Sequence, residues 1–137
     1  MISKQTLEQA VLAAVEAVDA QAGCITQMLG DVLILVAEHV PDGGTLQTGH
    51  GYLVSDYPVT QDVLSAPRSC VVSLADNDPD DAEAGLLRNL GYDAVLMLPL
   101  LVGGTVWGLV EIYAVGRSFS DADARAVEAI LAETLAP

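Results

Sequence analysis

The sequence predicts a single domain of the α+β class, built on a mainly antiparallel sheet. Two hairpin patterns carry this prediction, because apolar segments meet at Gly30-Asp31 and again at Gly103-Gly104, and tight turns of this kind join antiparallel strands. A length of 137 residues fits one domain. The apolar content of 52% allows a sizeable core, and the aromatic content of only 4% makes that core aliphatic.

The charge of the chain restricts its partners. Nineteen acidic residues against five basic ones give a formal net charge of −14. Such a surface repels phosphate backbones and anionic lipid head groups, so we expect no nucleic-acid partner and no membrane partner. No apolar run reaches the roughly 18–20 residues of a membrane span, and residues 1–4 do not begin a signal peptide. We therefore expect a cytoplasmic protein in which Cys24 and Cys70 are reduced, buried thiols.

Residues 6–20 show the periodicity of a first helix. Ser3 is the expected N-cap and Gly23 follows the helix end. One face carries apolar residues at helical spacing, namely Leu7, Val11, Ala14, Val15 and Val18.

Segments 24–29 and 32–40 then predict the first hairpin. Residues 32–36 are apolar at every position, which indicates that both faces of the sheet are covered. A turn is expected at 41–44, a short extended piece at 52–54, a short helix from Pro58 to Leu64 and a strand at 70–74.

A further helix is expected to begin after Asp78 as N-cap, with Pro79 at its first position and Gly91 as its C′ residue. Its first turn is rich in negative charge, which is favourable at a helix N-terminus. These acidic residues are Asp80, Asp81 and Glu83, and the apolar face is Leu86, Leu87 and Leu90.

Segments 94–102 and 105–113 predict the second hairpin. If Val102 faces Thr105, an unbroken register pairs Leu96 with Glu111. Pro99 inside the strand implies a bulge or a missing ladder bond, and Gly108 indicates a close backbone approach. The last helix is expected to begin near Ser120, with Asp123 completing a capping box and Phe119 preceding it.

The order of these elements and motifs resembles that of a GAF domain of bacterial signalling proteins. The resemblance covers nearly the whole chain and is carried by residues 7–40, by residues 56–64 with Asp-Tyr-Pro-Val-Thr at their start, and by residues 90–121. The last segment holds the most recognisable motifs, which are Pro99-Leu100, Gly103-Gly104, Gly108-Leu109 and Phe119-Ser120.

The resemblance implies a profilin-like central antiparallel sheet of about five or six strands, within the usual range. It places the terminal helices on one face, and loops and short helices enclosing a small-molecule pocket on the other. It also implies a homodimer formed through the terminal helices, and other domains of a signalling protein as partners.

Catalytic and metal motifs receive no support from the spacing. The sequence contains no nucleophile elbow and no Walker loop. His39 and His50 lie beside loop-like sequence, and no Cys-x-x-Cys or His-x-x-x-His pair indicates zinc. The acidic run 76–81 fails as an EF-hand, because Asp81 and Leu87 replace the required glycine and glutamate. We expect neither an enzyme nor a metal site.

Eight residues are candidates for lining the pocket, in competition with a role in the core: Tyr52, Tyr57, Thr60, Cys70, Val72, Met97, Trp107 and Glu111. Met97 and Trp107 fall on opposite faces of the second hairpin, so at most one of them reaches the pocket. Glu111 interrupts an apolar strand, and it either faces solvent at a sheet margin or accepts a hydrogen bond from a pocket ligand.

The leading interpretation is a non-catalytic, small-molecule-sensing regulatory domain. No cofactor is identified, because the Asn-Lys-Phe-Asp-Glu signature of cyclic-nucleotide-binding members and a Cys-His bilin-attachment pair are missing from the sequence, and no strong candidate for a haem ligand stands out. One alternative is a dimerisation and scaffold module with a vestigial pocket. A second alternative is a thiol enzyme similar to the GAF-like methionine sulfoxide reductases, with Cys24 and Cys70 as its thiols.

Overall fold

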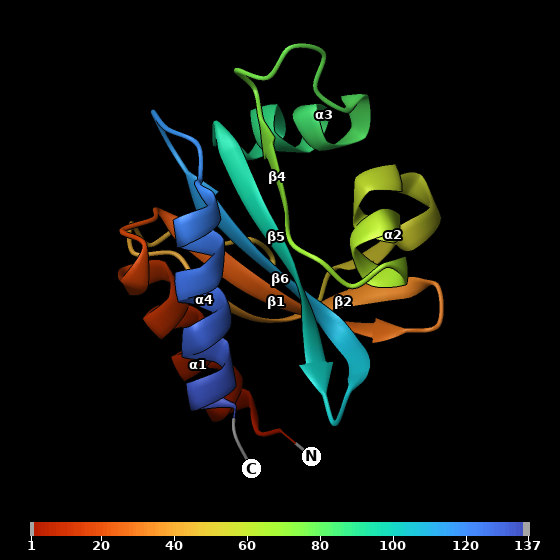
Figure 1. Ribbon diagram of the computed structural model, residues 1–137, viewed down its shortest axis with the longest axis vertical. Coiled ribbons are helices and arrows are strands. Elements are labelled where there is room, and N and C mark those ends of the chain that lie inside the picture. Colours follow the sequence, from red (N-terminus) through yellow and green to blue (C-terminus); the bar gives the residue numbers. More distant parts are fainter. Residues whose placement is uncertain (1, 136–137) are drawn as a thin grey trace.

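A computed structural model describes residues 2–135 as a six-stranded sheet with four α-helices. All neighbouring strands are antiparallel, in the order β3-β2-β1-β6-β5-β4, which confirms the α+β class (Figure 1). The elements in chain order are α1 (Lys4–Ala17), β1 (Ala22–Leu29), β2 (Val32–His39), β3 (Gly51–Leu53), the 3-10 turn η1 (Val54–Asp56), α2 (Pro58–Ser65), β4 (Cys70–Ser73), α3 (Asp81–Leu90), β5 (Ala94–Val102), β6 (Thr105–Ala114) and α4 (Asp121–Thr134).

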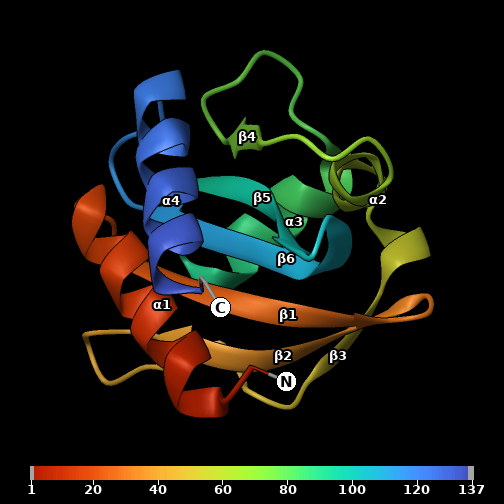
Figure 2. The same ribbon diagram turned by 60° about the horizontal axis from the view of Figure 1, so that its bottom comes forward.

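The sheet has a separate apolar core on each face. The helices α1 and α4 pack side by side over one face, as the two views show (Figures 1 and 2). Their core includes Val11, Val127 and Ile112. On the other face α2 and α3 contribute Val63 and Leu87 to a second core. The two-sided cover predicted from the apolar strands is therefore confirmed.

Helix α1 begins earlier than its apolar periodicity predicted, at Lys4 instead of residue 6. Ser3 is the N-cap as expected, and its hydroxyl accepts a hydrogen bond from the backbone N–H of Thr6 at 3.1 Å. The helix ends at Ala17 instead of residue 20, because Asp19 has a φ of 52°, which is outside the helical region.

The register of the β5–β6 hairpin shifts by one residue between Leu100 and Leu101. The pairing of Leu96 with Glu111 is therefore wrong, and Met97 lies opposite Glu111 instead. The extra residue at the shift is Trp107, so a bulge lies near Pro99 as predicted, but on the neighbouring strand β6. Gly108 does allow a close approach, but to β1, where an added Cβ would collide with the carbonyl oxygen of Thr26.

Helix α3 begins at Asp81, so the predicted start after Asp78 is wrong. Asp78 has a φ of 69°, which places it in the preceding loop with Pro79. The N-cap is Asp80, whose carboxylate accepts a hydrogen bond from the N–H of Glu83 at 3.1 Å. Gly91 ends the helix in the left-handed region with a φ of 85°, as its position predicted.

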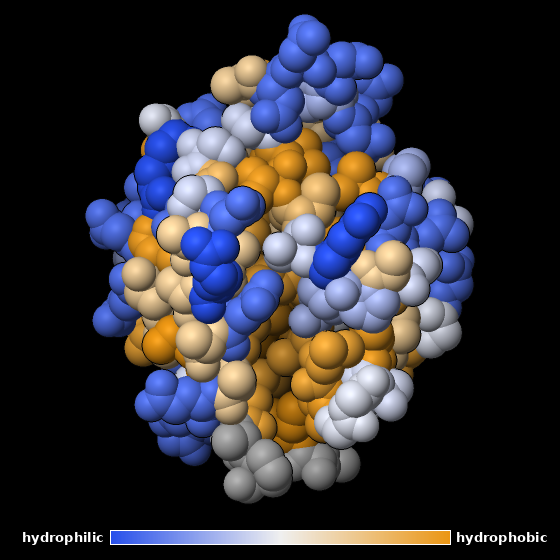
Figure 3. All heavy atoms as spheres, viewed as in Figure 1, coloured by the Kyte–Doolittle hydropathy of each residue, from blue (hydrophilic) through white to orange (hydrophobic). Residues whose placement is uncertain are grey.

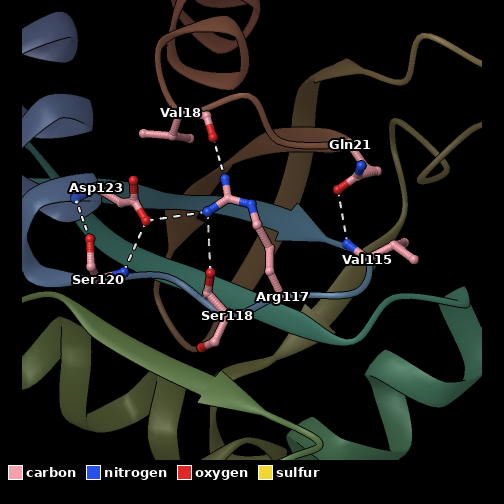
Figure 4. Close-up of polar contacts among 7 residues, drawn as sticks. All are labelled: Val18, Gln21, Val115, Arg117, Ser118, Ser120 and Asp123. Atoms are coloured by element: carbon pink, nitrogen blue, oxygen red, sulfur yellow. Dashed lines mark hydrogen bonds and ion pairs between the residues drawn. The ribbon is translucent and has the colours of Figure 1, made fainter.

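The start of α4 is fixed by a capping box and by an arginine. The N–H of Ser120 donates to Asp123 at 2.9 Å, and the N–H of Asp123 donates to the Ser120 hydroxyl at 3.2 Å. Arg117 donates to the carbonyl oxygen of Val18 at the end of α1 and pairs with Asp123 at 3.4 Å (Figure 4). The end of α1 is thus connected to the first turn of α4.

Candidate functional site

A cavity of about 450 Å³, including its open mouth, lies on the sheet face that α2 and α3 cover. The walls lie close together, so without movement the interior holds only about a water-sized group. Its lining comes from β1, β2, β3, β6, α2, α3 and the neighbouring loops, namely Cys24, Thr26, Leu33, Leu35, Leu46, Tyr52, Tyr57, Thr60, Glu83, Leu86, Leu90, Glu111 and Tyr113.

Strand alternation on β6 points Glu111 and Tyr113 into the cavity and Ile112 toward the terminal helices. β6 lies in the middle of the sheet, between β1 and β5. Glu111 is therefore only 9% exposed, and the expectation that it faces solvent at a sheet margin is wrong. The tyrosine hydroxyl of Tyr113 donates to Oε2 of Glu111 at 3.3 Å.

Glu83 is a second buried carboxyl group in the cavity wall, with an exposure of 1%. The hydroxyl of Thr60 in α2 donates to its Oε1 at 3.0 Å. From the sequence, Glu83 was interpreted only as a favourable charge in the first turn of a helix. A signal was present, because Glu83 precedes Leu86 by three residues and Leu87 by four, which places it on the apolar face of α3.

Burial dominates the electrostatics of both carboxyl groups. The pKa of Glu111 is raised to about 8, chiefly by loss of solvent and also by the nearby Glu83, while the hydrogen bond from the Tyr113 hydroxyl opposes the rise. Burial also raises the pKa of Glu83, against the hydrogen bond from Thr60. At neutral pH and without a ligand, Glu111 is therefore mostly protonated.

Two tyrosines form the wall on the side of β3 and α2. The rings of Tyr52 and Tyr57 meet edge to face with centroids 6.1 Å apart. The imidazole of His50 packs against Tyr52 in the same manner, at 5.0 Å. Burial raises the pKa of both phenols above 10, so both remain neutral hydrogen-bonding groups.

Four of the eight predicted pocket residues lie in the cavity wall: Tyr52, Tyr57, Thr60 and Glu111. Cys70, Val72 and Met97 belong to the core on the same face of the sheet but are not part of the lining. Trp107 packs against the core on the opposite face. Strand periodicity determines the face of such a residue, but the cavity occupies only part of the space between that face and the helices α2 and α3.

The two cysteines are both free thiols. Burial raises the pKa of Cys24 well above 9 and also raises the pKa of the half-buried Cys70. A raised pKa leaves less thiolate, which is the reactive form. Within residues 2–135, no three His, Cys, Asp or Glu side chains lie close enough together to hold a metal ion, and no helix is long and apolar enough to cross a membrane.

A second hollow, strongly apolar, opens near the ends of the terminal helices (Figure 3). It lies between α1, α4 and the turn end of β5. Its apolar lining includes Ile2, Leu98, Leu101, Val102, Leu131 and Leu135. Leu101 and Val102 are exposed there.

The sheet, the two terminal helices on one face and the cavity on the other define a profilin-like α+β domain. The sequence matches the GAF domain family over residues 4–136, and the chain belongs to that family. No curated protein matches it in sequence.

Solved structures with the same fold share little sequence with the chain. The PixJ GAF domain of Thermosynechococcus elongatus, in its blue-light absorbing form, superposes with a TM-score of 0.79 at 14% identity, covering 96% of this chain and 81% of that one. The chromophore-binding domain of a Stigmatella aurantiaca phytochrome gives 0.77 at 14% identity, covering 96% and 52%. A bacteriophytochrome of R. palustris gives 0.80 at 12% identity, covering 96% and 33%. The chain thus spans about half of the Stigmatella aurantiaca structure and about a third of the R. palustris structure.

Proposed function

We propose that this chain is a non-catalytic regulatory domain of a bacterial signalling protein, and that it senses a small molecule in the cavity beneath α2 and α3. The observation that carries the proposal is the pair of buried carboxyl groups, Glu83 and Glu111, which open into that cavity. A carboxyl group is costly to bury and adds nothing to an apolar core. Convergent polar groups in an otherwise apolar cavity are typical of ligand sites.

The ligand state would be transmitted through α1 and α4 in a homodimer. Glu111 lies in the cavity wall, whereas its neighbours Val110 and Ile112 pack in the core beneath the terminal helices. A shift of β6 on ligand binding therefore changes the surface on which those helices rest. The apolar hollow at the helix ends offers a surface for a second copy of the chain.

We do not propose that this chain binds a chromophore, as its structural relatives do. Its interior is narrow, and neither Cys24 nor Cys70 is followed by histidine. The raised pKa values of the two thiols likewise argue against the thiol-enzyme alternative.

A second function, a dimerisation and scaffold module with a vestigial pocket, is favoured by one observation. The interior is close to filled by its own side chains. The two functions differ in a measurable way, because only a sensor requires the walls to open for a ligand.

Native mass spectrometry of freshly purified protein, followed by a denaturing spectrum, tests the proposal. We expect a dimer with additional non-covalent mass that disappears on denaturation. Leu86→Trp, which fills the cavity from α3, should abolish that mass, whereas Leu29→Trp at an exposed site should retain it. A dimer that carries no added mass and binds no compound of a metabolite library would support the scaffold function. A monomer would contradict transmission through paired helices.

A further inference from the structure

The cavity has an imbalance of charged groups. Among the described residues 2–135, two carboxyl groups line it, but no basic side chain does. The five lysine and arginine residues of the chain all lie elsewhere: Lys4, Arg68, Arg88, Arg117 and Arg125. His50 packs against Tyr52 but is not part of the cavity lining. The protein itself therefore supplies no cation to neutralise Glu83 or Glu111 in their ionised form.

Each of the two carboxyl groups also has one oxygen that no protein donor reaches. Both of these oxygens are accessible to solvent, because no fully buried side-chain oxygen in residues 2–135 lacks a hydrogen-bond partner. Thr60 donates to Oε1 of Glu83, and Tyr113 donates to Oε2 of Glu111. Within residues 2–135, no side chain or backbone N–H donates to Oε2 of Glu83 or Oε1 of Glu111. These two side chains are more than nine-tenths buried, and both line the cavity. A carboxylate accepts up to about four hydrogen bonds, so most of this capacity is unused.

The remaining wall fits an organic cation better than a metal ion. Ca²⁺ needs roughly six to eight oxygen ligands and Mg²⁺ an octahedral set, whereas this cavity offers two carboxyl groups and a few hydroxyls. Tyr52 and Tyr57 add aromatic rings, which attract ammonium and guanidinium groups through their faces. The interior as it stands holds only about a water-sized group, so the walls must move apart to admit even a small head group.

We propose that the cavity binds a small organic cation, a protonated amine or guanidinium group, which donates to Glu83 and Glu111 and contacts the rings of Tyr52 and Tyr57. This inference rests on the proposed sensing function and specifies the class of its ligand. The cation provides the missing partner for both carboxyl groups, and charge-assisted hydrogen bonds of this kind are stronger than neutral ones.

Binding of such a cation is coupled to proton release. Glu111 lies opposite Cys24 of β1 and Met97 of β5. The other groups around it in the cavity are Tyr113 of its own strand, Glu83 of α3, and Tyr52 and Tyr57 of the other wall. None of these groups is cationic, and the free protein holds a proton on Glu111 at neutral pH. The ligand must displace that proton, so the affinity should rise with pH up to about 8.

Calorimetric titration of the purified protein with methylguanidinium chloride tests the proposal, and methylurea serves as the neutral compound of the same shape. We expect methylguanidinium to bind about tenfold or more tightly than methylurea. Glu83→Gln and Glu111→Gln should each weaken it by about tenfold or more. Glu8→Gln removes an exposed carboxylate of α1 and controls for the general attraction of a chain with charge −14; it should change little.

Three results overturn the cation class. They are equal binding of methylurea, tighter binding of acetate, and an affinity for methylguanidinium that both carboxyl variants leave unchanged. In each case, the sensing function would still be supported if native mass spectrometry finds a co-purified compound that is absent from Leu86→Trp. Only a cationic ligand would then be excluded. If no probe binds and no such mass is found, the sensing function fails as well. Circular dichroism shows whether each carboxyl variant folds. If one of them does not fold, the affinity of the other for methylguanidinium tests the proposal.

Discussion

The hydroxyl of Thr60 in α2 and Oε1 of Glu83 in α3 form a hydrogen bond of 3.0 Å, and both side chains are buried. This contact connects the two helices that cover the cavity. It also places the carboxyl group of Glu83 in the wall opposite the sheet, from which Glu111 approaches.

Thr60→Val should destabilise the protein. The substitution keeps the shape of the side chain but removes the donor, so that Oε1 of Glu83 is left buried without a partner. We expect the free energy of unfolding in urea to fall by about 1–3 kcal/mol. Thr105→Val, at the exposed start of β6, is the matched control. In a Glu83→Leu background, which offers Thr60 no acceptor, Thr60→Val should cost less; an unchanged cost would show that the hydrogen bond is unimportant.

The stability of the unliganded protein should fall as the pH rises from about 4.5 to about 8. Glu111 has a pKa of about 8 in the folded protein against an ordinary value of 4.5, so over this range the unfolded chain loses its proton first. One such group contributes at most about 1.4 kcal/mol per pH unit. Urea unfolding at several pH values should show this slope.

The pH slope should be much smaller in Glu111→Gln, because glutamine does not titrate. Glu83, whose pKa is also raised, keeps a residual slope of the same sign. Glu38 acts in the opposite direction, because its pKa is lowered in the folded protein. Its effect on stability is confined to pH values below about 4.5. Equal slopes in the wild type and in Glu111→Gln would mean that Glu111 is ionised in the folded state.

Two glycine-to-alanine substitutions should have opposite effects. In Gly108→Ala the new Cβ would collide with the backbone oxygen of Thr26, so β6 and β1 would have to separate. We expect a loss of about 3 kcal/mol or more, or no folding. Gly85→Ala in α3 meets no atom within 4 Å and should raise the free energy of unfolding by about 0.5–1 kcal/mol. Thermal melts of the two variants make the comparison, and a tolerated Gly108→Ala would contradict the register of β6 on β1.

Arg117→Ala should loosen the junction between α1 and α4. The guanidinium group loses its bonds to the Val18 carbonyl and to Asp123 (Figure 4). Because the side chain is 38% exposed, we expect a cost of only about 1 kcal/mol. Faster amide hydrogen exchange should be confined to the end of α1 and the start of α4. Arg125→Ala, on the exposed side of α4, should leave exchange unchanged.

The two thiols should react slowly with iodoacetamide at neutral pH. Cys24 is buried and should react only when the protein unfolds, whereas the half-buried Cys70 should react more slowly than a free thiol because its pKa is raised. Mass spectrometry of alkylated protein over time measures both rates. Rapid alkylation of Cys70 in folded protein would revive the thiol-enzyme alternative.

The positions of most elements could be predicted from local sequence. The capping box of Ser120 and Asp123, the left-handed Gly91 and the turn at Gly30-Asp31 depend only on neighbouring residues, and each lies where expected. The start of α3 was predicted wrongly, because Asp78 and Asp80 are equally good caps in sequence. Only the backbone conformation of the loop selects Asp80.

The cavity could be predicted only in part. Tyr52, Tyr57, Thr60 and Glu111 were identified from their place in GAF-like motifs or from a charge inside an apolar strand. Glu83 was missed, because its favourable position near a helix N-terminus offered a sufficient explanation for its charge.

The sequence by itself determined the fold class, the two hairpins and the N-caps of α1 and α4, because each follows from periodicity and local backbone preferences. The order and spacing of its motifs indicated the GAF family, which the family match confirms. The tertiary structure alone decided that Glu83 and Glu111, which are 28 positions apart in the chain, share one cavity without a basic partner. Two residues on different elements meet only when α3 packs over the sheet. The register of β6 on β5 likewise depends on a bulge at Trp107, within β6 itself.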